Sequence, residues 1–128
     1  MSVGYLLDAS ALLALLQREP GADAVATLLP ASAMTTVNWS EVVQMARAHG
    51  VQVERMADDL RGVGLEFLPF DVADAEATAN LSSVAAGRRL SLADRACMAA
   101  AQRLGVPAVT ADRSWTDVGS RIEVQLIR

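Results

Sequence analysis

Four acidic residues stand where a parallel sheet would bring them to a common edge. Asp8 and Asp112 each end a short apolar run that predicts a strand, and Glu41 and Asp94 lie in the first turns of two predicted helices. In open α/β sheets the ligand site lies beyond the carboxyl ends of the strands. Carboxylates gathered there at low dielectric repel one another, so such a cluster persists when a cation neutralises it.

The other residue types narrow the choice of cation. Oxygen ligands without His or Cys select Mg²⁺ or Mn²⁺ rather than Zn²⁺, and the sequence contains only one His and one Cys. A divalent ion held by carboxylates activates water and clamps the oxygens of a phosphodiester. The expected chemistry is therefore hydrolysis of a phosphate ester.

Each acid also has a purely structural explanation. The segments Asn38-x-x-Glu41 and Ser91-x-x-Asp94 both match the capping box, and carboxylates are favourable at helix N-termini in any case. The two acids that follow strands could be turn or N-cap residues. Taken singly, the acids are explained by capping, and only their expected convergence favours a metal site.

Composition limits the remaining possibilities. All 11 basic residues are Arg, which excludes a Walker A lysine and Schiff-base chemistry. With 128 residues, 52% of them hydrophobic, the chain is expected to form one domain over residues 1–128.

Its net charge of −4 means that phosphate contacts must come from local arginines. Arg95 and Arg113, each beside a proposed ligand, are the candidates, and the alternative for both is an ion pair that orders the cluster.

Short β-type runs alternate with longer helical runs, which predicts βαβ units around a mostly parallel sheet of about five strands. The expected strands are Tyr5 to Leu7, Ala33 to Thr36, Leu65 to Phe70, Pro107 to Thr110 and Glu123 to Ile127. The expected helices are Ser10 to Gln17, Ala22 to Leu29, Asn38 to His49, Val51 to Val63, Val72 to Ala86, Ser91 to Leu104 and a short one after Asp112. Gly50, Gly87 and Gly105 each follow a predicted helix, where a left-handed residue is expected.

Motifs along the whole chain resemble those of PIN domains, most closely the VapC-like toxin ribonucleases of bacterial toxin–antitoxin pairs. The matching segments are Leu7-Asp8-Ala9-Ser10, Asn38-Trp39-Ser40-Glu41-Val42, Leu90-Ser91-Leu92-Ala93-Asp94-Arg95-Ala96 and Thr110-Ala111-Asp112-Arg113. Each motif is weak alone, and four in order at suitable spacing are fairly specific. The resemblance implies a three-layer α/β/α fold around the parallel sheet.

The resemblance also implies a site, a substrate and partners. The acidic quartet coordinating Mg²⁺ or Mn²⁺ would be Asp8, Glu41, Asp94 and Asp112. Ser10 and Thr110 would be hydroxyls that fix carboxylate rotamers by hydrogen bonding, and Asp117 is a possible additional acid. The implied activity is endonucleolytic cleavage of RNA by a homodimeric toxin that a VapB-like antitoxin neutralises.

Two other functions are weighed against this one. Phosphatases of the haloacid dehalogenase type also begin with an Asp after an apolar strand, but they usually carry a second Asp two residues later, where Ser10 stands here. A non-catalytic PIN-like binding module would be marked by loss of ligand acids, and all four are present.

Apolar runs fall well short of the roughly 20 residues that span a bilayer, and the first residues do not match a signal peptide, so we expect a cytoplasmic protein without membrane contact.

Overall fold

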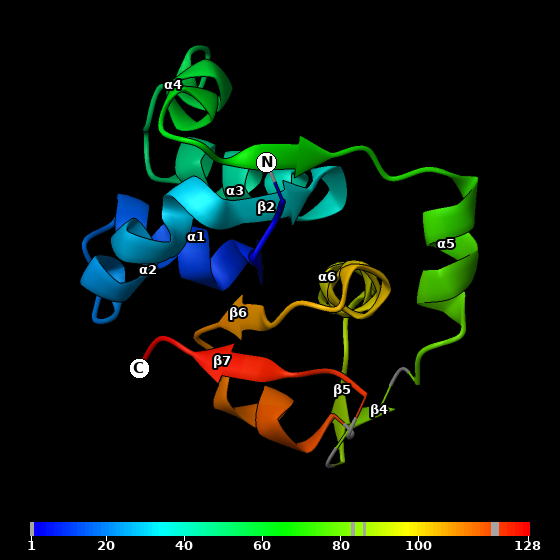
Figure 1. Cartoon of the computed structure of the whole chain (residues 1–128). Helices are drawn as coiled ribbons and strands as arrows, with labels where there is room; N and C mark the ends of the chain where they lie inside the picture. The colour runs from blue at the N-terminus through cyan, green and yellow to red at the C-terminus, as the bar shows by residue number, and fades with distance from the viewer. Residues whose placement is uncertain (1, 83, 86, 119–120) are drawn as a thin grey trace.

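The computed structural model describes residues 2–82, 84–85, 87–118 and 121–128 (Figure 1). Its main sheet has the strand order β3-β2-β1-β6-β7, and every pairing in it is parallel. These strands are β1 (Tyr5–Leu7), β2 (Ser32–Thr35), β3 (Glu66–Leu68), β6 (Ala108–Thr110) and β7 (Val124–Leu126). The predicted five-stranded parallel sheet is therefore confirmed.

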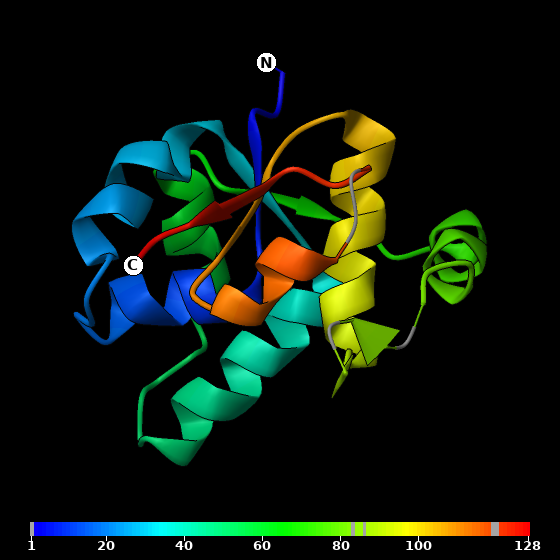
Figure 2. The same ribbon diagram turned by 90° about the horizontal axis from the view of Figure 1, so that it is seen from below.

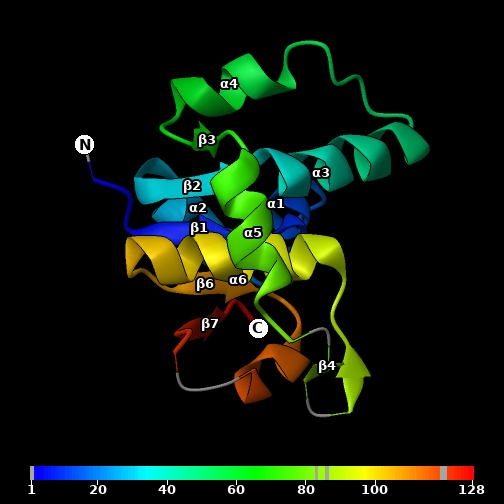
Figure 3. The same ribbon diagram turned by 90° about the vertical axis from the view of Figure 1, so that its right-hand side faces the viewer.

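The helices cover both faces of this sheet. They are α1 (Ala9–Leu16), α2 (Ala22–Leu28), α3 (Thr36–Ala48), α4 (Met56–Gly62), α5 (Val72–Ala79) and α6 (Leu92–Leu104), with the short 3₁₀ helices η1 (Leu29–Ala31) and η2 (Arg113–Asp117). Figure 2 shows α1 and α2 on one side of the sheet and α6 on the other. In Figure 3, α6 lies lengthwise along the sheet, and α5 packs on it.

Two hydrophobic clusters, one on each side of the sheet, hold these layers together. Leu6 and Leu7 are neighbours in β1 and both are fully buried, yet they belong to different clusters because successive strand residues point to opposite faces. Leu6 packs with Cys97 and Met98 of α6, whereas Leu7 joins the cluster that contains Leu12 of α1. Central strands that are apolar on both faces are typical of a parallel sheet covered by helices. The three-layer α/β/α architecture is thus confirmed.

The strand order places a topological switch point at the centre of the sheet. From β1 the chain proceeds to β2 and β3 on one side, and it later places β6 and β7 on the other side. In open α/β sheets a crevice forms at such a point, beyond the carboxyl ends of the strands. Here those ends belong to β1 and β6, and Asp8 and Asp112 follow them.

Two predicted helix boundaries are wrong, each for a local reason. The fourth helix begins at Met56 rather than Val51, because the Val51 N–H donates to Ala46 O and Gly50, at φ +76°, closes α3. The predicted helix Val72 to Ala86 ends at Ala79. It is followed by an antiparallel hairpin of β4 (Val84–Ala85) and β5 (Arg88–Arg89), and Gly87, at φ +75°, lies in the turn instead of ending a helix.

No helix in the described ranges is long and apolar enough to cross a membrane.

Candidate active site

Asp8 lies at the carboxyl end of β1 with its carboxylate held by three donors. Its Oδ1 accepts the Ala11 N–H at 2.9 Å and the Ser10 hydroxyl at 2.7 Å, and its Oδ2 accepts the Thr110 hydroxyl at 2.5 Å. The backbone contact makes Asp8 the N-cap of α1, as the sequence allowed. The side chain is nevertheless almost completely buried.

Burial raises the pKa of Asp8 from 3.8 to about 6. The hydrogen bonds from Thr110, Ser10 and Ala11 lower this pKa, and the charge of Asp94 raises it. Desolvation therefore outweighs the three hydrogen bonds, and no positively charged group among the described residues contributes to the pKa of Asp8.

The predicted supporting hydroxyls connect Asp8 to the end of β6. Besides donating to Asp8, the Ser10 oxygen accepts the Ala111 N–H at 2.9 Å, and the Thr110 oxygen accepts the Asp112 N–H at 3.0 Å. Each hydroxyl has one proton and two acceptor lone pairs, so both roles are compatible. The network joins the start of α1 to the residues that follow β6.

Glu41 and Asp94 come from different helices and interact electrostatically with Asp8. The pKa of Glu41 is raised by partial burial of its carboxylate, then by the charges of Asp94 and Asp8. Cys97, which lies one turn after Asp94 on α6, is fully buried, and its pKa is raised by that burial and then by the charges of all three acids. Three of the four predicted acids thus lie within electrostatic range of one another and of the same buried thiol.

Asp94 also caps α6, as predicted. The Ser91 hydroxyl accepts the Asp94 N–H and the Asp94 Oδ2 accepts the Ser91 N–H, both at 3.0 Å, which completes a capping box. The corresponding box expected at Asn38 and Glu41 is not formed. Helix α3 begins at Thr36 with Thr35 as N-cap, so Asn38 lies inside the helix.

Asp112 is held at the start of η2. Its Oδ1 accepts the Ser114 N–H at 3.0 Å and the Ser114 hydroxyl at 2.7 Å, so it is the N-cap of this short helix. It is connected to Asp8 through the Thr110 hydroxyl. The side chain of Asp117, the possible additional acid, lies outside the described residues.

The two candidate arginines differ in exposure. Arg113 is exposed, whereas Arg95 is half-buried, and its Nε is buried without a hydrogen-bond partner. In the part of the chain that the structure describes, neither guanidinium forms an ion pair. The alternative role considered from the sequence, in which Arg95 and Arg113 order the acidic cluster through ion pairs, therefore has no support among these residues.

The chemistry of the donor set fits a hard divalent cation, but the carboxylates that the structure describes do not form a coordination shell. Asp8 and Glu41 are acids whose pKa values are raised partly by a neighbouring acid, which is the electrostatic effect that a cation would reverse. Within residues 2–82, 84–85, 87–118 and 121–128, however, no three His, Cys, Asp or Glu groups are placed to hold one ion together. Oxygens of Asp8 and Asp94 are bonded instead to hydroxyl and backbone donors.

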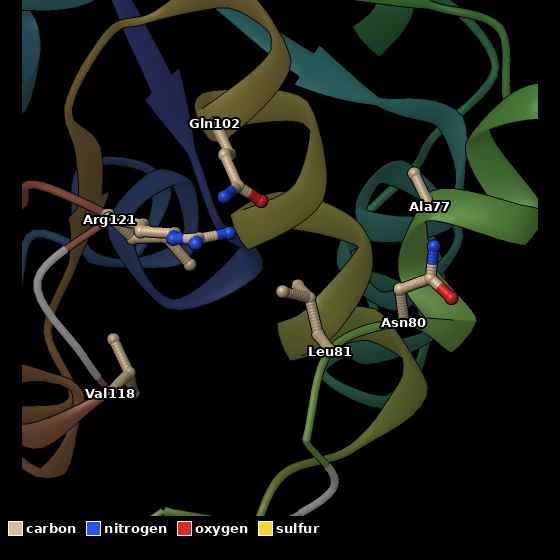
Figure 4. A pocket seen from close by; sticks show the side chains of 7 residues that line it. Ala77, Asn80, Leu81, Gln102, Val118 and Arg121 are labelled. Carbon is tan, nitrogen blue, oxygen red and sulfur yellow. The ribbon is translucent and has the colours of Figure 1, made fainter.

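A cavity of about 530 Å³ lies away from these acids, between α5, α6 and the residues before β7 (Figure 4). Arg121 extends into it below Gln102, and Asn80 stands on the opposite side. No acid is among its lining residues, which are Ala77, Asn80, Leu81, Gln102, Val118, Arg121 and Ile122. The cavity is therefore separate from the carboxylate site.

Solved structures that resemble this chain include two toxin–antitoxin complexes and a protein from Pyrobaculum aerophilum. The toxin–antitoxin complex from Klebsiella pneumoniae matches with a TM-score of 0.71 and 22% identity, covering 94% of this chain and 99% of that one. The DNA-bound VapBC from Salmonella typhimurium matches with a TM-score of 0.71 and 17% identity, covering 98% and 99%. PAE2754 from Pyrobaculum aerophilum matches with a TM-score of 0.60 and 25% identity, covering 97% and 92%.

No curated protein sequence matches significantly. The family model described as the PIN domain matches residues 5–120, from the start of β1 to beyond η2. Because this match spans nearly the whole sequence and every strand that carries a candidate acid, the chain belongs to the PIN domain family.

Proposed function

We propose that this protein is a metal-dependent endoribonuclease and the toxin of a toxin–antitoxin pair. The observation that carries the proposal is the buried Asp8 carboxylate after β1, whose pKa, like that of Glu41, is raised by burial and further by the charge of Asp94. These three acids come from separate segments of the chain. Asp8 follows β1 at the switch point of the sheet, where α/β proteins bind their ligands. The PIN domain match supports a nuclease, and the two toxin–antitoxin complexes among the structural neighbours support the toxin role.

Asp8, Glu41, Asp94 and Asp112 would hold Mg²⁺ or Mn²⁺. When bound, such an ion supplies a water of lowered pKa and positive charge for the phosphate oxygens. Ser10 and Thr110 fix the orientation of the Asp8 carboxylate through the hydrogen bonds described above. Because the pKa of Asp8 is about 6, this carboxylate is ionised in most molecules at neutral pH.

The arginines would supply the substrate contacts that the net charge of −4 does not. Arg95 carries a buried Nε without a partner next to Asp94, and Arg113 is exposed next to Asp112. A guanidinium donates to phosphate oxygens in a fixed fork geometry, which suits a phosphodiester. We assign both as contacts to the RNA backbone.

A VapB-like antitoxin is the proposed partner, because the Klebsiella and Salmonella neighbours are complexes of this kind. We further propose a homodimer that cleaves RNA, as the resemblance of the motifs implied, and that acts in the cytoplasm, as we expected from the sequence.

The function is tested by cleavage of total RNA with Mn²⁺ or Mg²⁺, with and without EDTA. The key variant is Asp94→Asn, and Asp74→Asn is a matched control, because Asp74 occupies the same capping-box position at the start of α5. We expect RNA cleavage by the wild type and by Asp74→Asn, and none by Asp94→Asn or in EDTA. Cleavage that survives EDTA, or equal cleavage by both variants, would contradict the metal site.

A further inference from the structure

Asn38 is a buried amide whose side chain leaves its own helix. It lies in the first turn of α3 and is 1% exposed. The sequence suggested that it caps this helix, but Thr35 does so, with its hydroxyl oxygen accepting the Asn38 N–H at 3.2 Å. The Asn38 amide group is therefore free of a capping role.

Both ends of this amide are bonded. Its Oδ1 accepts the Thr35 hydroxyl at 2.5 Å, and its Nδ2 donates to the backbone oxygen of Ala93 at 3.0 Å. Ala93 is itself buried in the first turn of α6. A buried amide with both ends bonded has a fixed position, because breaking either bond leaves a polar group without water or partner.

This contact joins the two helices at the turns that carry candidate acids. Glu41 follows Asn38 by three residues on α3, and Asp94 directly follows Ala93 on α6. The side-chain hydrogen bond spans 55 residues of sequence and packs the start of one helix against the start of the other. The pKa of Glu41 is raised by burial and then by the charge of Asp94, so the separation of these two carboxylates matters electrostatically.

We propose that Asn38 is a positioning residue that sets the separation of the Glu41 and Asp94 carboxylates. The inference rests on the proposed function, in which both acids hold the metal ion. Asn38 does not itself contact the ion or the substrate. A leucine or an ionised aspartate of similar size could not replace it, because neither can donate a hydrogen bond to the Ala93 carbonyl.

The test measures Mn²⁺ affinity by titration calorimetry and RNA cleavage by steady-state kinetics in Asn38→Ala. Outer-shell hydrogen bonds of metal sites contribute roughly 10- to 100-fold to metal affinity or activity. We expect the Kd for Mn²⁺ to rise by about 10-fold and kcat to fall by a similar factor, with KM unchanged. The side chain of Asn38→Ser is too short for its hydroxyl to reach Ala93 O, so this variant should lose Mn²⁺ affinity and kcat to the same extent. It replaces Asn38→Ala in the test if that variant does not fold.

Thr78→Val is the matched control for a lost buried hydrogen bond. Thr78 is 1% exposed, and its hydroxyl donates to Asp74 O within α5, a helix that carries none of the candidate acids. This variant should lose thermal stability without a change in Mn²⁺ affinity or kcat. If the Asn38 variants behave like Thr78→Val while the wild type binds Mn²⁺ and cleaves RNA, the positioning role alone is refuted. A wild type that neither binds Mn²⁺ nor cleaves RNA overturns the proposed function and this inference with it.

Discussion

Asp8→Asn should stabilise the metal-free protein at neutral pH, although it removes a residue of the proposed site. The pKa of Asp8 is raised from 3.8 to about 6 by burial. A folded-state pKa above the unfolded value means that stability is fully present below pH 3.8 and is lost as pH rises through about 6. At about 1.4 kcal/mol for each tenfold change in affinity for the proton, ionised Asp8 lowers the free energy of unfolding by about 3 kcal/mol at pH 7.5.

The pH dependence separates this effect from an ordinary change in packing. About 2 of the roughly 3 kcal/mol are lost between pH 4.5 and pH 7.5, because the lower half of that range lies between the two pKa values. Asparagine is neutral and similar in shape, so it can still accept the Ser10 hydroxyl and the Ala11 N–H that Asp8 accepts. The advantage of Asp8→Asn over the wild type should therefore grow by about 2 kcal/mol from pH 4.5 to pH 7.5.

The assay is urea unfolding in EDTA at the two pH values, with the slope of the transition checked for constancy. Asp58→Asn is the control, because the Asp58 side chain is 82% exposed, whereas that of Asp8 is almost completely buried. Its difference from the wild type should be the same at both pH values. An Asp8→Asn difference that is likewise independent of pH would refute the argument that burial of this charge destabilises the fold.

Three further outcomes are expected. Adding Mn²⁺ at pH 7.5 should raise the unfolding temperature of the wild type and leave that of Asp8→Asn unchanged in a thermal scan, since a ligand stabilises only the state that binds it. Thr110→Val removes a hydrogen bond that lowers the pKa of Asp8, so the acidic limb of the cleavage rate should move to higher pH, and an unchanged pH profile would contradict this. Cells that express the wild-type chain should stop growing and cells that express Asp112→Asn should not, and equal growth curves would count against a toxin.

The features that the sequence predicts well are those contained in a short segment. The strand that precedes Asp8 and the capping box of Ser91 and Asp94 depend on residues that are near neighbours in the chain, and both form as expected. The predictions are wrong where a short sequence pattern favours one structure and a hydrogen bond that the pattern does not reveal favours another. Val51 could begin a helix by its sequence, but its N–H closes the preceding one. Asn38 fits a capping box in the sequence, but Thr35 is the N-cap of α3. The side chain of Asn38 therefore bonds to the backbone of α6 instead.

The amino-acid sequence by itself determined which acids are available, their order, and the alternation of strands and helices that places them near strand ends. Only the tertiary structure decided that β1 and β6 are neighbours, that Asp8 is buried with a raised pKa, and that Asn38 bonds to Ala93. The residues in these contacts are 55 or more positions apart. Their proximity follows from the packing of whole layers rather than from any local preference, because helix and strand patterns specify which face of an element is buried and not which element covers it.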